Sequence, residues 1–215
     1  MNLVNYIYMS ILSLCFLTGL IYFKSFILPI KVIFLYVTIS FVVEILGFYS
    51  LYLSPEKKVN TILYSIYAPI SLLILSFFFY IIIDNVQIKK VILCLGLLFG
   101  LIQVLYIYIN LNIGYNFRVF MGAIIILSAY SIIFFRQLLN AEASFFENPN
   151  FWIVTGILFF YTGYFFLSGF INYISTKDPI LARKLFTINH LLNIIYYSLI
   201  TYGFICQRKL AKSSS

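Results

Sequence analysis

The sequence has very few charged residues. Only 9% of its 215 residues are Asp, Glu, Lys or Arg, whereas 63% are hydrophobic and the mean hydropathy is +1.04. A soluble domain carries about 25% charged and about 45–50% apolar residues. A chain with so few charges cannot cover a water-facing surface. This composition excludes a soluble enzyme and a nucleic-acid-binding domain, and it leaves an integral membrane protein.

Residue types that build metal and cofactor sites are also scarce. The chain has one histidine and three isolated cysteines, Cys15, Cys94 and Cys206, with no CxxC pair. This excludes a disulfide framework and a histidine-rich metal centre. The last apolar run has no mid-span lysine for a retinal, and no nucleophile elbow, P-loop or HExxH motif occurs. We therefore expect no enzyme activity, no metal and no cofactor.

Long apolar runs, by contrast, fill the chain. A membrane-spanning helix needs about 20 mostly apolar residues, whereas a barrel strand needs only about 10. The runs predict an all-α polytopic membrane protein, a seven-transmembrane-helix bundle that forms a single transmembrane domain over residues 1–215. The predicted helices cover about residues 3–23, 30–53, 59–83, 88–111, 116–139, 149–174 and 184–207.

Local signals refine the sixth predicted helix. Asn148 followed by Pro149 is typical of an N-cap residue followed by the first helical position. Gly156, Gly163 and Gly169 predict sites where a neighbouring helix approaches closely.

The distribution of basic residues predicts an orientation, because cytoplasmic loops carry an excess of Lys and Arg. Eight basic residues lie on the side of the odd connections and the C-terminus, and six lie on the opposite side. We therefore expect a multi-pass protein of the bacterial inner membrane with the N-terminus outside and the C-terminus inside. The basic segment Arg208–Lys212 predicts contact with anionic lipid.

Glu44 is the one acidic residue well inside a predicted span, about 4 Å from the middle of its helix. An ionisable group at that depth is costly, and its default interpretation is functional. Three interpretations stay open for this residue: a structural hydrogen bond between helices, contact with a ligand or ion, and a proton relay.

Other polar residues gather at the same depth as Glu44. Consecutive helices run antiparallel, so residues after the middle of an even helix and before the middle of an odd helix share one half of the membrane. The residues placed in this half are Glu44, Tyr67, Gln103, Tyr164, His190 and Asn193. Asn189, Asn193, Tyr197 and Thr201 form one stripe of the last predicted helix. The pattern predicts a ligand-binding pocket in the outer half, floored by Glu44 and roofed by aromatic side chains, with helix–helix hydrogen bonding as the alternative.

Several short motifs stand out along the chain, namely EILG (44–47), ENPNFWIVTG (147–156), YTG (161–163), NIIYY (193–197) and FICQRK (204–209). Together they resemble motifs of small, uncharacterised seven-helix membrane proteins from Bacteroidota, which are similar to membrane sensor regions of histidine kinases. The resemblance implies a sensory or signalling role and carries no catalytic residues. Since no kinase domain follows in this sequence, the resemblance implies a separate membrane or kinase partner.

The sequence as a whole predicts a sensory or accessory module. It would bind a small or lipidic ligand, or a partner helix, in the polar pocket and signal through a separate protein. Its expected surroundings are the lipid bilayer, without nucleic acid. Two alternatives stay open: a transporter or channel subunit with Glu44 in the pathway and Pro69 as a hinge, and an effector that disrupts the membrane.

Overall fold

The computed structural model describes residues 3–53, 57–109, 117–140, 145–175 and 177–213, and these residues form seven α-helices joined by short connections. The predicted all-α fold is confirmed. The helices are α1 (Leu3–Tyr22), α2 (Leu28–Leu53), α3 (Lys57–Ile82), α4 (Val86–Ile109), α5 (Phe117–Leu139), α6 (Pro149–Ser175) and α7 (Pro179–Ser213). Single 3-10 turns follow α1 (Phe23–Ser25) and precede α6 (Phe145–Glu147).

Side-chain caps explain where three of the helices begin. The Asn148 side-chain oxygen accepts a hydrogen bond from the Asn150 amide at 2.9 Å, as the sequence predicted for the start of α6. Asn85 caps α4 in the same way. Asp178 accepts bonds from the amides of Ile180 and Leu181, both at 3.0 Å. This last cap was not predicted, and it starts α7 five residues earlier than expected.

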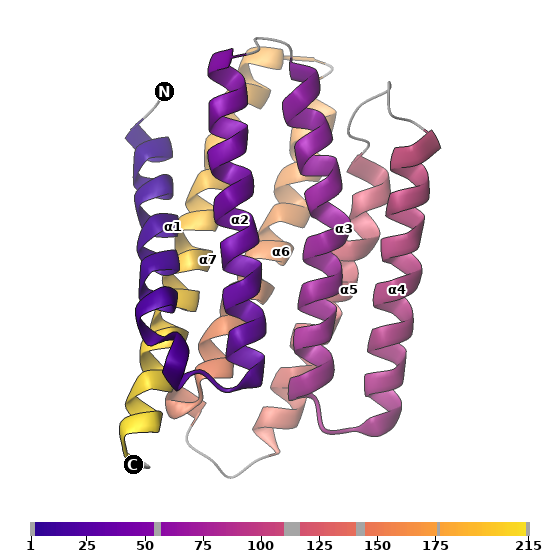
Figure 1. Cartoon of the computed structure of the whole chain (residues 1–215). Coiled ribbons are helices and arrows are strands. Elements are labelled where there is room, and N and C mark those ends of the chain that lie inside the picture. Colours follow the sequence, from indigo (N-terminus) through magenta and orange to yellow (C-terminus); the bar gives the residue numbers. More distant parts are fainter. Residues whose placement is uncertain (1–2, 54–56, 110–116, 141–144, 176, 214–215) are drawn as a thin grey trace.

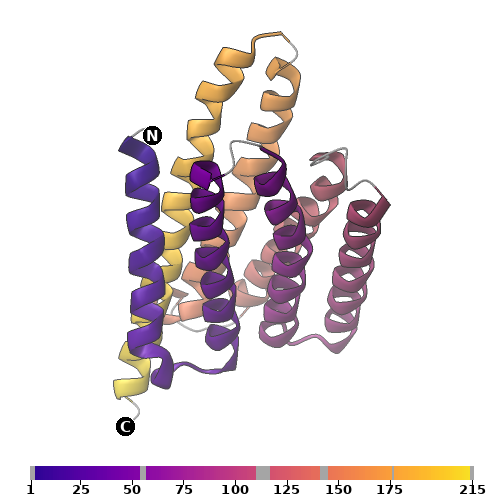
Figure 2. The same ribbon diagram turned by 45° about the horizontal axis from the view of Figure 1, so that its top comes forward.

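The helices lie in two layers. Figure 1 shows α1, α2, α3 and α4 in the front layer and α7, α6 and α5 behind them, and the turned view in Figure 2 agrees. The layers pack closely where α1 meets α7 and where α3 meets α5. Within the described residues, α2 packs mainly on α3 and α1. Its contacts with α7 include ring pairs such as Phe34 with Phe204 and Tyr36 with Tyr196.

The helices have the length and composition of membrane spans. Six of the seven helices that the structure describes, α1 to α6, are long and apolar enough to cross a membrane. The outward side of α4 is an example, because it exposes a row of large aliphatic side chains: Leu97, Leu98, Leu101, Val104 and Leu105. A bundle of this kind indicates a membrane protein. Helix α7 is the exception, because polar residues interrupt its apolar sequence; it packs along α6 and α1.

One half of the bundle is tightly filled. We call the half nearer the C-terminus the closed half, and buried apolar residues from both layers meet there, including Phe26, Phe78 and Phe204. The rings of Phe26 and Phe204 lie with centroids 4.9 Å apart. Since side chains of both layers interdigitate here, the closed half has the packing of an ordinary protein core.

Glycines allow α6 and α7 to approach closely at two of the three predicted positions. A Cβ atom on Gly156 would lie 3.1 Å from the Tyr196 ring, and one on Gly163 would lie 2.8 Å from Leu192 Cδ2. The prediction was wrong for Gly169, because a Cβ atom there would meet nothing within 4 Å. Gly169 is exposed near the end of α6, beyond this close contact.

Candidate functional site

A cavity of about 880 Å³ lies between the two layers, in the half of the bundle nearer the N-terminus. We call it the interlayer cavity. All seven helices contribute lining residues: α1 and α5 contribute from their first halves, α3 and α7 mainly from theirs, α4 from its second half, α2 mainly from its second half, and α6 from residues near its middle. Its volume is in the range of pockets that hold a drug-sized ligand.

The structure brings all six residues of the predicted pocket to this one cavity. They come from five different helices: Glu44, Tyr67, Gln103, Tyr164, His190 and Asn193. The six residues therefore lie at a similar depth in the bundle and line the same cavity. Whether they bind a ligand stays a prediction.

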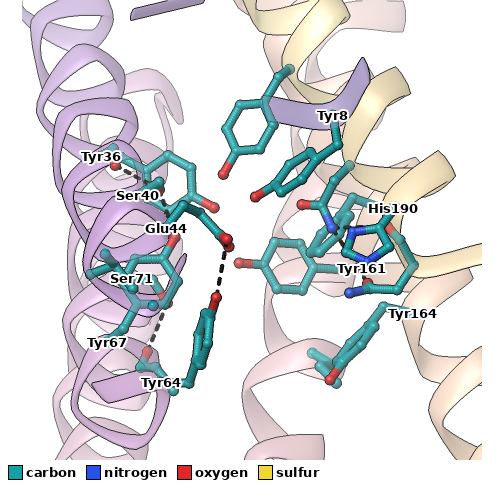
Figure 3. Close-up of a pocket in the computed structure, with 18 of the residues that line it drawn as sticks. Tyr8, Tyr36, Ser40, Glu44, Tyr64, Tyr67, Ser71, Tyr161, Tyr164 and His190 are labelled. Atoms are coloured by element: carbon teal, nitrogen blue, oxygen red, sulfur yellow. Dashed lines mark hydrogen bonds between the residues drawn. The ribbon is translucent and has the colours of Figure 1, made fainter. Parts of the chain in front are cut away.

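Glu44 is held by a hydrogen bond from a neighbouring helix. The Tyr64 hydroxyl on α3 donates to Glu44 Oε2 at 3.0 Å. Tyr8 projects from α1 toward the same carboxyl group (Figure 3). Gly47 makes room for this arrangement, because a Cβ atom there would lie 3.1 Å from the Tyr64 hydroxyl. Glu44 can thus serve both as a hydrogen-bonding group between helices and as a ligand contact. Tyr64 of α3 holds the carboxyl group in place, and the same carboxyl group lines the cavity.

Glu44 does not form the floor of the cavity, so this part of the prediction was wrong. The lining extends along α2 to Tyr36, about 12 Å further toward the closed half. Ser40 lies between them; its hydroxyl donates to the Tyr36 carbonyl at 2.8 Å and shares a 2.7 Å hydrogen bond with the Tyr67 hydroxyl. Glu44 therefore lies partway along the wall rather than at its end.

Several polar atoms in the lining have no hydrogen-bond partner among the residues that the structure describes. Gln103 is 0% exposed, and neither Nε2 nor Oε1 of its amide is bonded. Asn60 Oδ1 and His190 Nδ1 are also buried and unbonded. An unsatisfied buried polar group costs about 1–3 kcal/mol. These atoms are thus poised to bond with whatever occupies the cavity.

The polar stripe of α7 lines the cavity for most of its length. Asn189, Asn193 and Tyr197 face the cavity, whereas Thr201, one turn further, is buried outside it. The Asn193 side-chain amide donates to the Asn189 carbonyl at 2.9 Å. His190 also lines the cavity, with its ring centroid 5.5 Å from that of Tyr8. Because these side chains face the cavity, α7 does not expose them to lipid.

Aromatic residues form much of the remaining wall. The lining includes seven tyrosines, namely Tyr8, Tyr36, Tyr64, Tyr67, Tyr161, Tyr164 and Tyr197, together with Phe48, Phe160 and Phe186. Among the described residues that line the cavity, Glu44 is the one carboxylate, and none is Lys or Arg. Glu44 is therefore the single position at which the described lining can carry a carboxylate charge.

The chemical groups of the lining are few in kind. Within the part of the chain that the structure describes, no group of three or more His, Cys, Asp and Glu side chains is placed to hold a metal ion. The cavity supplies one carboxyl group, neutral hydrogen-bonding groups and aromatic surface. These are the features of a pocket that selects a molecule by shape and polarity.

Sequence reasoning missed Tyr64, which donates a hydrogen bond to Glu44, and it also missed Tyr8, Asn60 and Tyr161. A signal was present, because Tyr8, Asn60 and Tyr64 lie in the first halves of odd helices and Tyr161 lies just before the midpoint of α6. If the argument from antiparallel helices had been applied to every polar and aromatic residue, it would have placed Tyr8, Asn60 and Tyr64 in the same half of the bundle as Glu44. It would not have shown which of them face inward, because that depends on the rotation of each helix.

Comparison of the chain with protein-family models, curated proteins and solved structures gives no match. The resemblance to seven-helix Bacteroidota proteins and to sensor regions of histidine kinases therefore stays a prediction.

Proposed function

We propose that the protein is a receptor-like sensory or accessory module of a bacterial inner membrane. In this proposal a small or lipidic molecule occupies the interlayer cavity, and a separate membrane or kinase partner receives the signal. The observation that carries the proposal is the convergence of six polar and aromatic residues from five helices on one 880 Å³ cavity, with the Gln103 amide buried and unbonded in its wall.

The proposal includes a seventh span and an orientation. Helix α7 runs antiparallel to α6 and beside it, and its 35 residues are ample to cross a bilayer. Its polar side chains line the cavity instead of facing lipid. With the N-terminus outside, as the basic residues favour, the interlayer cavity lies in the outer half of the membrane and is available to molecules outside the cell.

The closed half favours binding over conduction. Buried side chains such as Ile33, Phe78 and Phe204 fill the space between the layers there, so the interlayer cavity does not continue through them as a pore. A ligand that binds one packing of the helices better than another shifts the population between the two. A cavity lined by all seven helices is well placed to couple occupancy to helix packing.

Thiol accessibility tests the cavity in purified protein reconstituted in lipid nanodiscs. The native cysteines are first replaced by alanine, and a single cysteine is then introduced as Gln103→Cys or Asn193→Cys. Ser131→Cys is the matched control, because Ser131 is buried in the closed half and lies outside the cavity lining. We expect a small water-soluble thiol reagent to modify the first two variants at least about tenfold faster than the control, since reaction requires access.

Equal protection of all three positions would overturn the binding proposal. Reconstitution into liposomes separates it from the alternatives. Solute or ion movement that depends on Glu44 would favour a transporter or channel, and leakage on triggering would favour a membrane-disrupting effector. Tight vesicles, together with co-purification of a kinase or another membrane protein, would support the receptor-like role.

A further inference from the structure

The interlayer cavity has a chemical bias that goes beyond its size. Its one formally charged residue is Glu44, and the described lining contains seven tyrosines, three phenylalanines and no Lys or Arg. From this combination we infer that the interlayer cavity selects an organic cation, an amine or quaternary ammonium group on an apolar body, with Glu44 as its counter-ion. The inference rests on the proposed binding function and names its ligand class.

The carboxyl group is positioned to receive a cation. Tyr64 donates to Oε2 at 3.0 Å, and Tyr8 approaches the same group from α1. A carboxylate accepts hydrogen bonds at about four lone-pair positions, so these contacts leave capacity on the side of the cavity. Both neighbours are neutral hydroxyls, and the described lining holds no Lys or Arg to balance the charge.

A charge buried without an opposite charge is costly, and the cost is greater at membrane depth. A cationic guest lowers this cost, because its attraction to the carboxylate is strong where water is excluded. An anionic guest raises the cost, and a neutral guest leaves it unchanged. The basic residues of the chain lie near the helix ends and in the connections, where water and lipid headgroups solvate them, so they do not supply the missing counter-charge.

The aromatic wall suits the same guest. Ring faces carry negative electrostatic potential and attract cations within about 6 Å of the ring centroid, and aromatic cages of this kind recognise quaternary ammonium groups. Tyr8, Tyr64 and Tyr161 approach Glu44 from three different helices (Figure 3). The space around the carboxyl group is therefore enclosed by aromatic side chains from both layers.

The polar atoms without hydrogen-bond partners indicate which other groups the ligand carries. Gln103 offers both a donor and an acceptor, whereas Asn60 Oδ1 is an acceptor. Apolar lining residues such as Leu72 and Ile124 lie among these groups. The cavity thus fits a molecule with one positive centre, an apolar body and a neutral hydrogen-bonding group.

The test uses a reporter cysteine that removes no polar group. Ala123 lines the cavity, so Ala123→Cys is prepared in the chain whose native cysteines are replaced by alanine, in nanodiscs. Its modification rate is measured with a trimethylammonium-ethyl and a sulfonatoethyl methanethiosulfonate, each normalised to the rate with a free thiol. We expect the normalised rate with the cationic reagent to be at least about tenfold higher than with the anionic one. The Coulomb attraction of a partly buried charge pair is large enough to give such a ratio.

Two further variants assign the preference to Glu44. Glu44→Gln keeps an acceptor for Tyr64 but removes the charge, and we expect it to abolish the preference. Glu147→Gln is the matched control, because Glu147 is exposed at the opposite end of the bundle, and we expect it to keep the preference. In parallel, benzyltrimethylammonium is expected to protect Ala123→Cys from N-ethylmaleimide, whereas its neutral isostere neopentylbenzene gives at least about tenfold weaker protection.

The outcomes separate this inference from the proposed function. If all reagents modify Ala123→Cys without charge preference, or if the preference survives Glu44→Gln, the cation inference is wrong and the binding cavity stands. If none of the reagents reaches Ala123, Gln103 or Asn193 in folded protein, the binding function itself is wrong. Unchanged melting temperature of each variant establishes that the protein is folded.

Discussion

The closed half and the cavity half of the bundle are built from the same seven helices, yet they differ in what lies between the layers. In the closed half, Phe78 and Phe204 are fully buried between the layers. In the cavity half, small residues such as Ala68 and Ala123 lie beside tyrosines, and a volume of about 880 Å³ stays open. Side-chain size and polarity at each depth therefore set where this bundle keeps a cavity.

We expect the largest change in the free energy of unfolding when a leucine is shortened to alanine, and we expect this change to differ between the two halves. Leu75 is 0% exposed in the closed half, and Leu75→Ala is expected to lower the free energy of unfolding by about 3 kcal/mol, in the range for a fully packed leucine. Leu127 is also buried but borders the cavity. Leu127→Ala is expected to cost less, because this side chain already lacks contact atoms on one side. Unfolding in mixed detergent micelles measures both values, and equal losses would contradict the contrast.

An intermediate effect is expected from adding atoms instead of removing them. A Cβ atom on Gly203 would lie 2.7 Å from Ile153 Cγ1 and 3.1 Å from the Pro149 carbonyl oxygen. Gly203→Ala should therefore destabilise the closed half by about 2 kcal/mol, a typical cost of overpacking.

The matched addition in the cavity half is Ala123→Leu, which projects into open space. We expect little loss of stability from this variant, together with slower thiol modification of Asn193→Cys in the same chain. A melting temperature lowered as far as in Gly203→Ala would show that the space beside Ala123 is not open.

The smallest expected effect concerns single hydroxyl groups. Tyr130 donates to the Ile92 carbonyl at 3.0 Å in the closed half, and Tyr130→Phe should cost about 1 kcal/mol. Tyr64 donates to Glu44 at a similar distance, but water or a guest in the cavity can replace its hydroxyl. Tyr64→Phe is thus expected to change stability less than Tyr130→Phe. The opposite order in the same unfolding assay would mean that the Glu44 region is sealed.

Much of the fold was predictable because the bilayer imposes it. A backbone that crosses lipid must satisfy its own hydrogen bonds, so long apolar runs become helices. The predicted boundaries of the first six helices agree with the structure within a few residues, and Asn148 caps α6 as expected. Helix α7 was harder, because the Asp178 cap extends its start and its basic C-terminal residues continue the helix to Ser213.

The candidate site was predictable in depth but not in detail. Chain direction alone placed Glu44, Gln103 and His190 in one half of the bundle. It did not reveal that Tyr64 donates to Glu44, because that contact depends on how α2 and α3 rotate and on the space left by Gly47. The same reason explains why Glu44 was wrongly placed at the floor of the cavity.

The amino-acid sequence alone was enough to indicate a membrane protein, the approximate limits of its helices, and the depth of its polar residues. These properties follow from local composition and from a rise of about 1.5 Å per residue along each helix. The folded structure was needed to show that the polar residues face one shared cavity and that side chains fill the opposite half. Those features depend on the packing of side chains far apart in the chain, which no local pattern of residues specifies.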